Sequence, residues 1–315
     1  MNLKHIEINI GKACNNKCKF CMSSQAKKSD KIFVKKELLK KKVDFYEENG
    51  YKSIGFLGGD ISIYPDLEEI ILYCREKNFR SINIISNSMR FDDIGFLTKI
   101  VKAGSTRFNI SIHSHINTIE DYLTSVPGGL KRKLKAIDNL NILIQNGLLN
   151  SPLSINMVIN KINYETITES VLYFFYKKNI KDIRINFIWL SEDIEDNRDK
   201  LKISYTEFLP YLKKLIYISF KKDIRITFDA IPLCIFFKLG IQDMESIIKK
   251  FVGEDKDYIT SVDNINTSDE FNWVERKKNE LKTKLKVCES CKYNHSCQGV
   301  WKEYKEIYGD GEFGI

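Results

Sequence analysis

The chain has 315 residues, enough for one large α/β domain or for one domain with a smaller appendage. Its hydrophobic fraction of 43% and charged fraction of 29% are typical of a globular protein, and no apolar run approaches the roughly 20 residues that span a bilayer. The formal net charge of +8 comes from lysine-rich stretches with interleaved acidic residues, which favours solvated helix faces over a nucleic-acid surface.

The N-terminal sequence MNLKHIEINI has none of the features of a secretory signal, so we expect a cytoplasmic protein with reduced thiols. Six of the eight cysteines fall in two tight groups near opposite ends of the chain. Such grouping favours metal ligation over disulfides in a reducing compartment.

Six strands are predicted over the first 190 residues, because short runs rich in isoleucine, valine and phenylalanine alternate with helical patterns. These runs cover residues 5–10, 53–59, 81–87, 107–114, 153–160 and 182–190. Apolar residues spaced three and four apart predict helices between them, for example over 66–78 and 163–179. This alternation predicts an α/β fold with a parallel sheet, either open or curled into a partial barrel, and functional residues at the carboxyl ends of its strands.

The first predicted strand is followed by three cysteines in the pattern C-x3-C-x2-C, at Cys14, Cys18 and Cys21. A structural zinc site needs a fourth ligand, and the nearby His5 lies inside the strand. A redox pair would use only the last two of these cysteines and leave the first unexplained. Three thiolates suit a [4Fe–4S] cluster on which one iron has no protein ligand and is open to a small molecule.

This cysteine motif, with Phe20 before its last cysteine, resembles the cluster loop of the radical S-adenosylmethionine (SAM) superfamily. The resemblance implies a partial (β/α)6 barrel over residues 1–200 and a [4Fe–4S] cluster whose open iron binds SAM. It also implies that an electron from this cluster cleaves SAM to a 5′-deoxyadenosyl radical, which removes a hydrogen atom from the substrate. An electron donor such as a flavodoxin or ferredoxin is then an expected partner, and the enzyme should be oxygen-sensitive.

Polar motifs follow the later strands, where the same resemblance gives them roles. A Gly-Gly-acid triplet after a strand is by itself most often a turn. Here it stands where the family has a Gly-Gly-Glu that holds the methionine amino group of SAM, with a carboxylate one methylene shorter. The cofactor pocket is also expected to contain one residue after strand three, one on strand four and one near the start of strand five. The implied cofactor-binding residues are Phe20, Gly58, Gly59, Asp60, Asn87, Ser111 and Asn156.

His113 and His115 follow the fourth strand, and strand alternation places both on the same face as Ser111. A histidine titrates near neutral pH, which makes His113 a candidate catalytic residue. The alternative is a hydrogen-bonded histidine that lines the barrel.

Beyond residue 190 the strand–helix pattern changes. An acidic loop is predicted over 191–200, a helix over 205–222 and a strand over 224–234, and we expect a smaller C-terminal module over residues 201–315. A second cysteine trio follows in the pattern C-x2-C-x5-C. Either Cys234 or His295 would complete this metal site, and cysteine at both ends of the module favours the first. The predicted ligands are Cys234, Cys288, Cys291 and Cys297.

The second trio resembles the SPASM and shortened twitch extensions of radical SAM enzymes, which implies one auxiliary cluster of the [4Fe–4S] type. Trp301 stands where a full SPASM domain has its next cysteine. A zinc knuckle is the alternative for this trio.

The resemblance leaves several substrate classes open. Enzymes of this kind with auxiliary clusters modify ribosomally made peptides, forming crosslinks, thioethers or epimers, which makes a peptide the first expectation. A nucleotide or sugar substrate is the second, as in molybdopterin-precursor synthesis or aminocyclitol oxidation, and the excess positive charge suits an anionic substrate. A zinc-stabilised nucleic-acid-binding protein is the third, but it does not explain why the cysteines share one edge with the Gly-Gly-Asp triplet.

Overall fold

The computed structural model describes residues 4–22, 33–241, 243–252, 260–264 and 269–313, and its centre is one nine-stranded sheet. The strand order is β7-β6-β5-β4-β3-β2-β1-β8-β9, and every neighbouring pair is parallel except β8 and β9. The predicted α/β fold with a mainly parallel sheet is therefore confirmed. The strands are β1 (His5–Asn9), β2 (Ser53–Leu57), β3 (Ser81–Ser86), β4 (Arg107–Ser111), β5 (Ser154–Ile159), β6 (Asp182–Phe187), β7 (Arg225–Asp229), β8 (Thr260–Asn264) and β9 (Asp269–Asn272).

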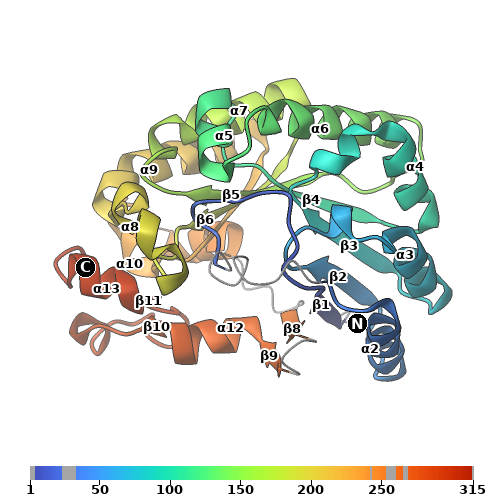
Figure 1. The fold of residues 1–315 in the computed structure, drawn as a ribbon. Helices are drawn as coiled ribbons and strands as arrows, with labels where there is room; N and C mark the ends of the chain where they lie inside the picture. The colour runs from blue at the N-terminus through green and yellow to red at the C-terminus, as the bar shows by residue number, and fades with distance from the viewer. Residues whose placement is uncertain (1–3, 23–32, 242, 253–259, 265–268, 314–315) are drawn as a thin grey trace.

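Helices connect the parallel strands and form an arc around the sheet, while the loop after β1 lies inside this arc (Figure 1). The helices up to β7 are α2 (Lys36–Glu48), α3 (Leu67–Glu76), α4 (Ile94–Ala103), α5 (Asn117–Thr124), α6 (Gly129–Gln145), α7 (Ile167–Lys178), α8 (Glu195–Leu201) and α9 (Tyr205–Lys222). After β7 come α10 (Leu233–Phe237), α11 (Met244–Ile247), α12 (Trp273–Arg276), the small antiparallel pair β10 (Lys282–Thr283) and β11 (Val300–Trp301), and α13 (Lys302–Tyr308).

The two faces of the sheet differ in polarity. Apart from Ser86 at the end of β3, alternate positions of β3 to β7 are isoleucine, phenylalanine or methionine, and these apolar side chains are buried in one core with the apolar residues of the helices. The positions between them are mainly polar and only partly buried, for example Asn83, Asn109, Asn156 and Asn186. Parallel sheets are usually apolar on both faces. The polar inner face of this sheet is therefore not a second packed core.

Several element boundaries differ from the sequence-based prediction. The fourth strand ends at Ser111 rather than at residue 114. The Ile112 N–H still donates to the Asn156 carbonyl on β5, but the N–H groups of His113 and Ser114 donate to the Glu120 side chain and not to a neighbouring strand. The predicted acidic loop over 191–200 was wrong in its second half, where α8 forms with acidic residues in its first turn and basic ones in its last, as the helix dipole favours.

The predicted strand over 224–234 was also too long, because β7 ends at Asp229 and α10 begins at Leu233. Pro232 directly precedes this helix, where its missing N–H costs no hydrogen bond, and it could not have paired inside a strand. The predicted helix over 205–222 is confirmed by α9, whose start is fixed by a capping box between Ser204 and Glu207.

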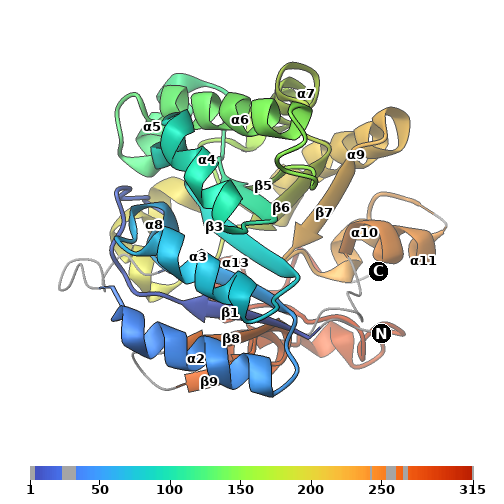
Figure 2. The same cartoon turned by 90° about the vertical axis from the view of Figure 1, so that its right-hand side faces the viewer.

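Strands from the last third of the chain join the same sheet. β7 pairs with β6, and β8 lies beside β1 although the two come from nearly opposite ends of the chain (Figure 2). The buried carboxylate of Asp263 on β8 accepts from the Tyr46 hydroxyl at 2.6 Å and lies 2.7 Å from the Lys42 ammonium, which ties β8 to α2. The sheet thus crosses residue 200, and a separate module over 201–315 stays a prediction.

No helix in the described part of the chain is both long enough and apolar enough to cross a membrane.

Candidate active site

The loop after β1, residues 11–22, is named here the cysteine loop, and its first half docks on the end of β2. The Gly59 N–H donates to the Gly11 carbonyl, and the Asp60 N–H donates to the Ala13 carbonyl, both at 2.8 Å. A Cβ atom on Gly59 would lie 1.9 Å from the Ala13 carbonyl oxygen. The Gly-Gly-Asp triplet is therefore needed for close packing of two backbones, since a side chain at Gly59 would separate them.

The second half of the cysteine loop is held by helix α5. The Lys17 N–H donates to the Thr124 carbonyl at 3.0 Å, and the Lys19 N–H donates to the Leu123 carbonyl at 2.9 Å. These two bonds flank Cys18 on either side. The backbone around this cysteine is thus fixed by another element of the fold.

N–H groups point at the sulfur atoms of the cysteine loop. The Asn16 N–H lies 3.4 Å from the Cys14 Sγ, and the Asn16 Nδ2 lies 3.8 Å from the Cys18 Sγ. The Nδ2 of Asn87 lies 3.9 Å from the Cys14 Sγ and donates to the Asn15 side chain at 2.6 Å. Donors of this kind stabilise thiolate sulfur and tune bound iron–sulfur clusters. Asn87 was predicted near this site, whereas Asn16 was missed although it lies between two of the cysteines.

Asp60 lies beneath this loop with its side chain buried. Its carboxylate accepts from the Ser62 N–H at 2.8 Å, the Ser86 hydroxyl at 2.7 Å and the Asn87 N–H at 3.1 Å. Burial raises the pKa of this carboxyl group, and the three donors act against that effect. These bonds join the end of β2 to the end of β3 and hold Asn87 beside the cysteine loop. They give Asp60 a structural role, and its predicted contact with SAM stays a prediction.

Ser111 and Asn156 lie in register on neighbouring strands, on the partly buried polar face of the sheet. The Asn156 side chain accepts from the Asn186 Nδ2 at 2.5 Å. Asn186 was missed by the sequence reasoning, although the alternation of polar and apolar residues along β6 carries the same signal. The polar row thus continues across β4, β5 and β6.

His113 is buried behind the cysteine loop. Its Nδ1 accepts the Val158 N–H at 3.1 Å, which places the ring proton on Nε2. Its ring meets the Phe20 ring edge to face at a centroid distance of 4.5 Å. Burial lowers the pKa of His113 to about 4, so the ring is neutral at physiological pH. A catalytic role for His113 stays a prediction, and these contacts give it a packing role.

His115 does not share the surroundings of His113, because strand alternation stops where β4 ends. Its Nδ1 lies 2.8 Å from the Ser170 hydroxyl, and its ring stacks on Tyr173 at 5.1 Å, both on α7. The two histidines therefore face different elements.

The depressed pKa of His113 predicts a specific pH dependence of stability. The unfolded histidine binds a proton below its ordinary pKa of 6.5, whereas the folded one resists protonation down to about 4. The free energy of unfolding should therefore decrease as pH drops from 6.5 to 4, by about 2 kcal/mol at pH 5. His113→Gln keeps an acceptor for Val158 without titrating, so its urea midpoint should change less between pH 7 and 5. An equal change in both proteins would show that His113 does not control this range.

The four cysteines predicted as the second metal site line one cavity of about 160 Å³. The lining cysteines are Cys234, Cys288, Cys291 and Cys297. The Leu285 N–H lies 3.5 Å from one of these sulfurs and the Gly299 N–H lies 3.4 Å from another. His295, the alternative fourth ligand, is exposed and does not line the cavity.

Within the described ranges, no group of three histidine, cysteine or acidic side chains meets the geometry for holding a single metal ion. Neither cysteine trio is therefore arranged in this structure as a preformed single-ion site. All eight cysteines are thiols, and Cys74 lies on α3 with its side chain buried in the hydrophobic core.

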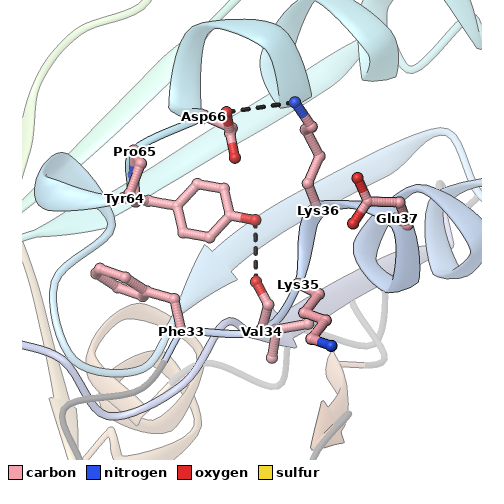
Figure 3. A pocket seen from close by; sticks show the side chains of 8 residues that line it. All are labelled: Phe33, Val34, Lys35, Lys36, Glu37, Tyr64, Pro65 and Asp66. Atoms are coloured by element: carbon pink, nitrogen blue, oxygen red, sulfur yellow. Dashed lines mark hydrogen bonds and ion pairs between the residues drawn. The ribbon is translucent and has the colours of Figure 1, made fainter.

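A second pocket, which is shallow and open to solvent, lies where α2 and α3 begin (Figure 3). The Tyr64 hydroxyl donates to the Val34 carbonyl at 3.0 Å, and Lys36 pairs with Asp66 at 3.4 Å across it. None of its lining residues is a predicted site residue.

Comparison with known proteins adds independent findings. The sequence model of the Radical SAM superfamily matches residues 8–174. A probable GTP 3′,8-cyclase of Saccharolobus islandicus (strain M.14.25 / Kamchatka #1) is 25% identical over 224 residues, which cover 71% of this chain and 68% of that protein.

Solved structures of SuiB from Streptococcus suis share the fold. SuiB bound to S-adenosylmethionine has a TM-score of 0.67 and 16% identity, covering 99% of this chain and 76% of that one. SuiB bound to the precursor peptide SuiA has a TM-score of 0.63 and 18% identity, covering 90% and 62%. The present chain thus spans less than two thirds of the SuiB chain in the peptide complex.

Proposed function

Because the chain belongs to the radical SAM superfamily, we propose that Cys14, Cys18 and Cys21 hold a [4Fe–4S] cluster with one iron open to SAM. The chemistry of the donor set supports this assignment, since three thiols lie on one short loop and N–H groups approach their sulfurs. When bound, the cluster supplies the electron that cleaves SAM to a 5′-deoxyadenosyl radical, and this radical takes a hydrogen atom from the substrate.

The residues around the cysteine loop give this chemistry its geometry. The glycine backbone after β2 fixes the first half of the loop, and α5 fixes the second half. Asn87 directs an N–H at Cys14, and the Phe20 ring packs edge to face on the buried ring of His113. A site fixed on this scale requires little reorganisation when it binds its cofactor.

We further propose that the sheet is the partial barrel of this superfamily and that its polar inner face is the wall of the substrate cavity. The ends of the strands would contact SAM through Gly58, Gly59, Ser111 and Asn156. The half-buried polar row on β4 to β6 supports this role, because its side chains alternate with those buried in the hydrophobic core and so lie on the other face of the sheet.

We propose an auxiliary [4Fe–4S] cluster of the twitch type at Cys234, Cys288, Cys291 and Cys297. Their common cavity supports it, as do the N–H groups directed at two of the sulfurs. Four thiolates would complete the ligand set and assign this cluster to electron relay or to shaping the substrate pocket. The zinc alternative predicts zinc and no sulfide in the purified protein.

The proposed substrate is a ribosomally made peptide, and the observation that carries this is the fit of the whole chain, C-terminal third included, to SuiB. SuiB has been solved with its precursor peptide bound. A nucleotide substrate is the second candidate, because curated relatives at 25% identity are probable GTP 3′,8-cyclases. A flavodoxin- or ferredoxin-like donor is the proposed source of electrons.

The test is anaerobic reconstitution with iron and sulfide, followed by reduction with SAM and an assay for 5′-deoxyadenosine. We expect slow SAM cleavage alone and faster cleavage with the true substrate. One arm adds GTP and follows its loss, and the other adds short peptides encoded beside the gene and follows their mass. Stimulation by GTP alone would overturn the peptide assignment, whereas no 5′-deoxyadenosine in any arm would contradict the proposed function.

A further inference from the structure

Helix α5 ends against the cysteine loop, and N–H groups of the loop donate to the last carbonyl groups of the helix. The last carbonyl groups of a helix have no partner within the helix. In α5 the Asp121 and Tyr122 carbonyls accept from the turn that follows, whereas those of Leu123 and Thr124 accept from Lys19 and Lys17 of the cysteine loop. The position of α5 therefore sets the position of the backbone around Cys18.

Glu120 on α5 is fully buried and joins three elements. Its Oε2 accepts from the N–H groups of His113 and Ser114, at 2.7 and 2.9 Å, directly after β4. Its Oε1 lies 2.6 Å from the Lys133 ammonium on α6. The buried ammonium of Lys133 also donates to the Ser111 carbonyl at 2.9 Å. The carboxylate is thus the common partner of α5, α6 and the end of β4.

The charge state of this pair is fixed by its contacts. Burial alone raises the pKa of Glu120, but Lys133 and the donated N–H groups together hold it below its ordinary value. The pair is therefore ionised inside the protein, where removing either partner leaves an uncompensated charge. Helix α5 has eight residues, too few to be stable without such tertiary contacts.

The same carboxylate acts on the cysteine loop by a second route. The N–H of His113 that it accepts belongs to the residue whose ring packs on Phe20 of the loop. One route thus runs through the helix carbonyls to the backbone beside Cys18, and the other runs through His113 to Phe20.

We propose that Glu120 and Lys133 are positioning residues of the radical SAM site, which hold α5 and the end of β4 so that the cysteine loop presents its thiols in a cluster-binding arrangement. This inference rests on the proposed cluster at Cys14, Cys18 and Cys21. Neither residue is among the site residues predicted from the sequence. Neither touches the cofactor or the substrate in this role.

The test compares cluster retention, not only activity, in Glu120→Gln and Lys133→Met. Loss of a partner that orients metal ligands lowers metal affinity by about 10- to 100-fold. After reconstitution, reduction and addition of SAM, we therefore expect the SAM-responsive EPR signal of Glu120→Gln to decay about tenfold faster in excess chelator. Lys133→Met should show a smaller acceleration, because Glu120 keeps its bonds to His113 and Ser114.

Two control variants separate positioning from general stability. Tyr46→Phe removes a buried hydroxyl from the α2–β8 contact, and Asp138→Asn weakens an ion pair between α6 and α7, so both should keep the wild-type decay rate. If Glu120→Gln does not fold, the neutral pair Glu120→Gln/Lys133→Met removes the unpaired charge and is tested in its place.

A folded Glu120→Gln or double variant with wild-type signal decay would overturn the positioning role, even if its thermal stability were lower. A wild-type protein with no SAM-responsive signal would instead contradict the proposed function. The two failures are therefore distinguishable.

Discussion

Cys18→Ala is expected to abolish 5′-deoxyadenosine formation, whereas Cys291→Ala is expected to leave SAM cleavage measurable. The first variant removes a ligand of the proposed SAM-binding cluster, so we expect a loss of at least about 1,000-fold and about four irons out of eight. The second removes a ligand of the proposed auxiliary cluster, so a similar amount of iron should be lost while the SAM site stays intact. Substrate turnover should fail in both.

Cys18 and Cys291 form a matched pair because each is a partly exposed thiol in a trio, and each change deletes one sulfur. Iron and sulfide analysis, EPR with and without SAM, and the 5′-deoxyadenosine assay on both variants check the assignment. If Cys18→Ala still cleaves SAM, or if Cys291→Ala cannot, the roles of the two trios are not those proposed here. Zinc at the second site would show as metal without sulfide.

The sheet and the position of the cysteines could be predicted from sequence because both depend on local patterns. Strands that alternate with helices determine parallel neighbours, and the first seven strands lie in the order in which they occur. Motifs that directly follow a strand then fall at one edge, as the contact between the cysteine loop and Gly59 confirms for the first two. The predicted strands differ from the observed ones mainly at their ends, because side-chain hydrogen bonds and turns determine where a strand stops.

Other features depend on contacts between distant residues, which no local pattern encodes. Nothing in the sequence around Glu120 indicates that its carboxylate accepts N–H groups from the end of β4 or pairs with Lys133. The pairing of β8 with β1 joins residues from nearly opposite ends of the chain. His113 looked titratable in sequence, but its burial against Phe20 and Val158 determines its neutral state.

One missed signal was available in the sequence. Runs such as SINIIS, SINMVI and DIRINF alternate polar and apolar residues, whereas a parallel strand buried on both faces reads as continuously apolar. The alternation therefore predicts a polar inner face, and the partly buried Asn156 and Asn186 lie on it. A substrate with several hydrogen-bonding groups would suit such a wall, which both proposed substrate classes satisfy.

Gly59→Ala is expected to detach the cysteine loop from the sheet. The added methyl carbon would lie 1.9 Å from the Ala13 carbonyl oxygen, and the neighbouring atoms at Lys12 and Ala13 are also backbone, which cannot rotate away. We expect unfolding free energy to fall by about 3 kcal/mol. Cluster binding should fall with it, because the Gly59 and Asp60 N–H groups lose the carbonyls that position the start of the loop.

Gly55→Ala on β2, the strand that precedes Gly59, is the matched control, because its Cβ would lie 3.4 Å from the nearest atom, an ordinary contact with the His5 ring. Gly59 does not have a positive φ, so collision rather than backbone strain separates the two variants. Iron content after reconstitution and urea unfolding measure the two effects. Gly59→Ala that binds a full SAM-responsive cluster would show that the loop does not need this contact. Only the Gly59 change reaches the cysteine loop. Equal losses of stability and of iron in both variants would therefore assign the effect to β2 and not to the contact with the loop.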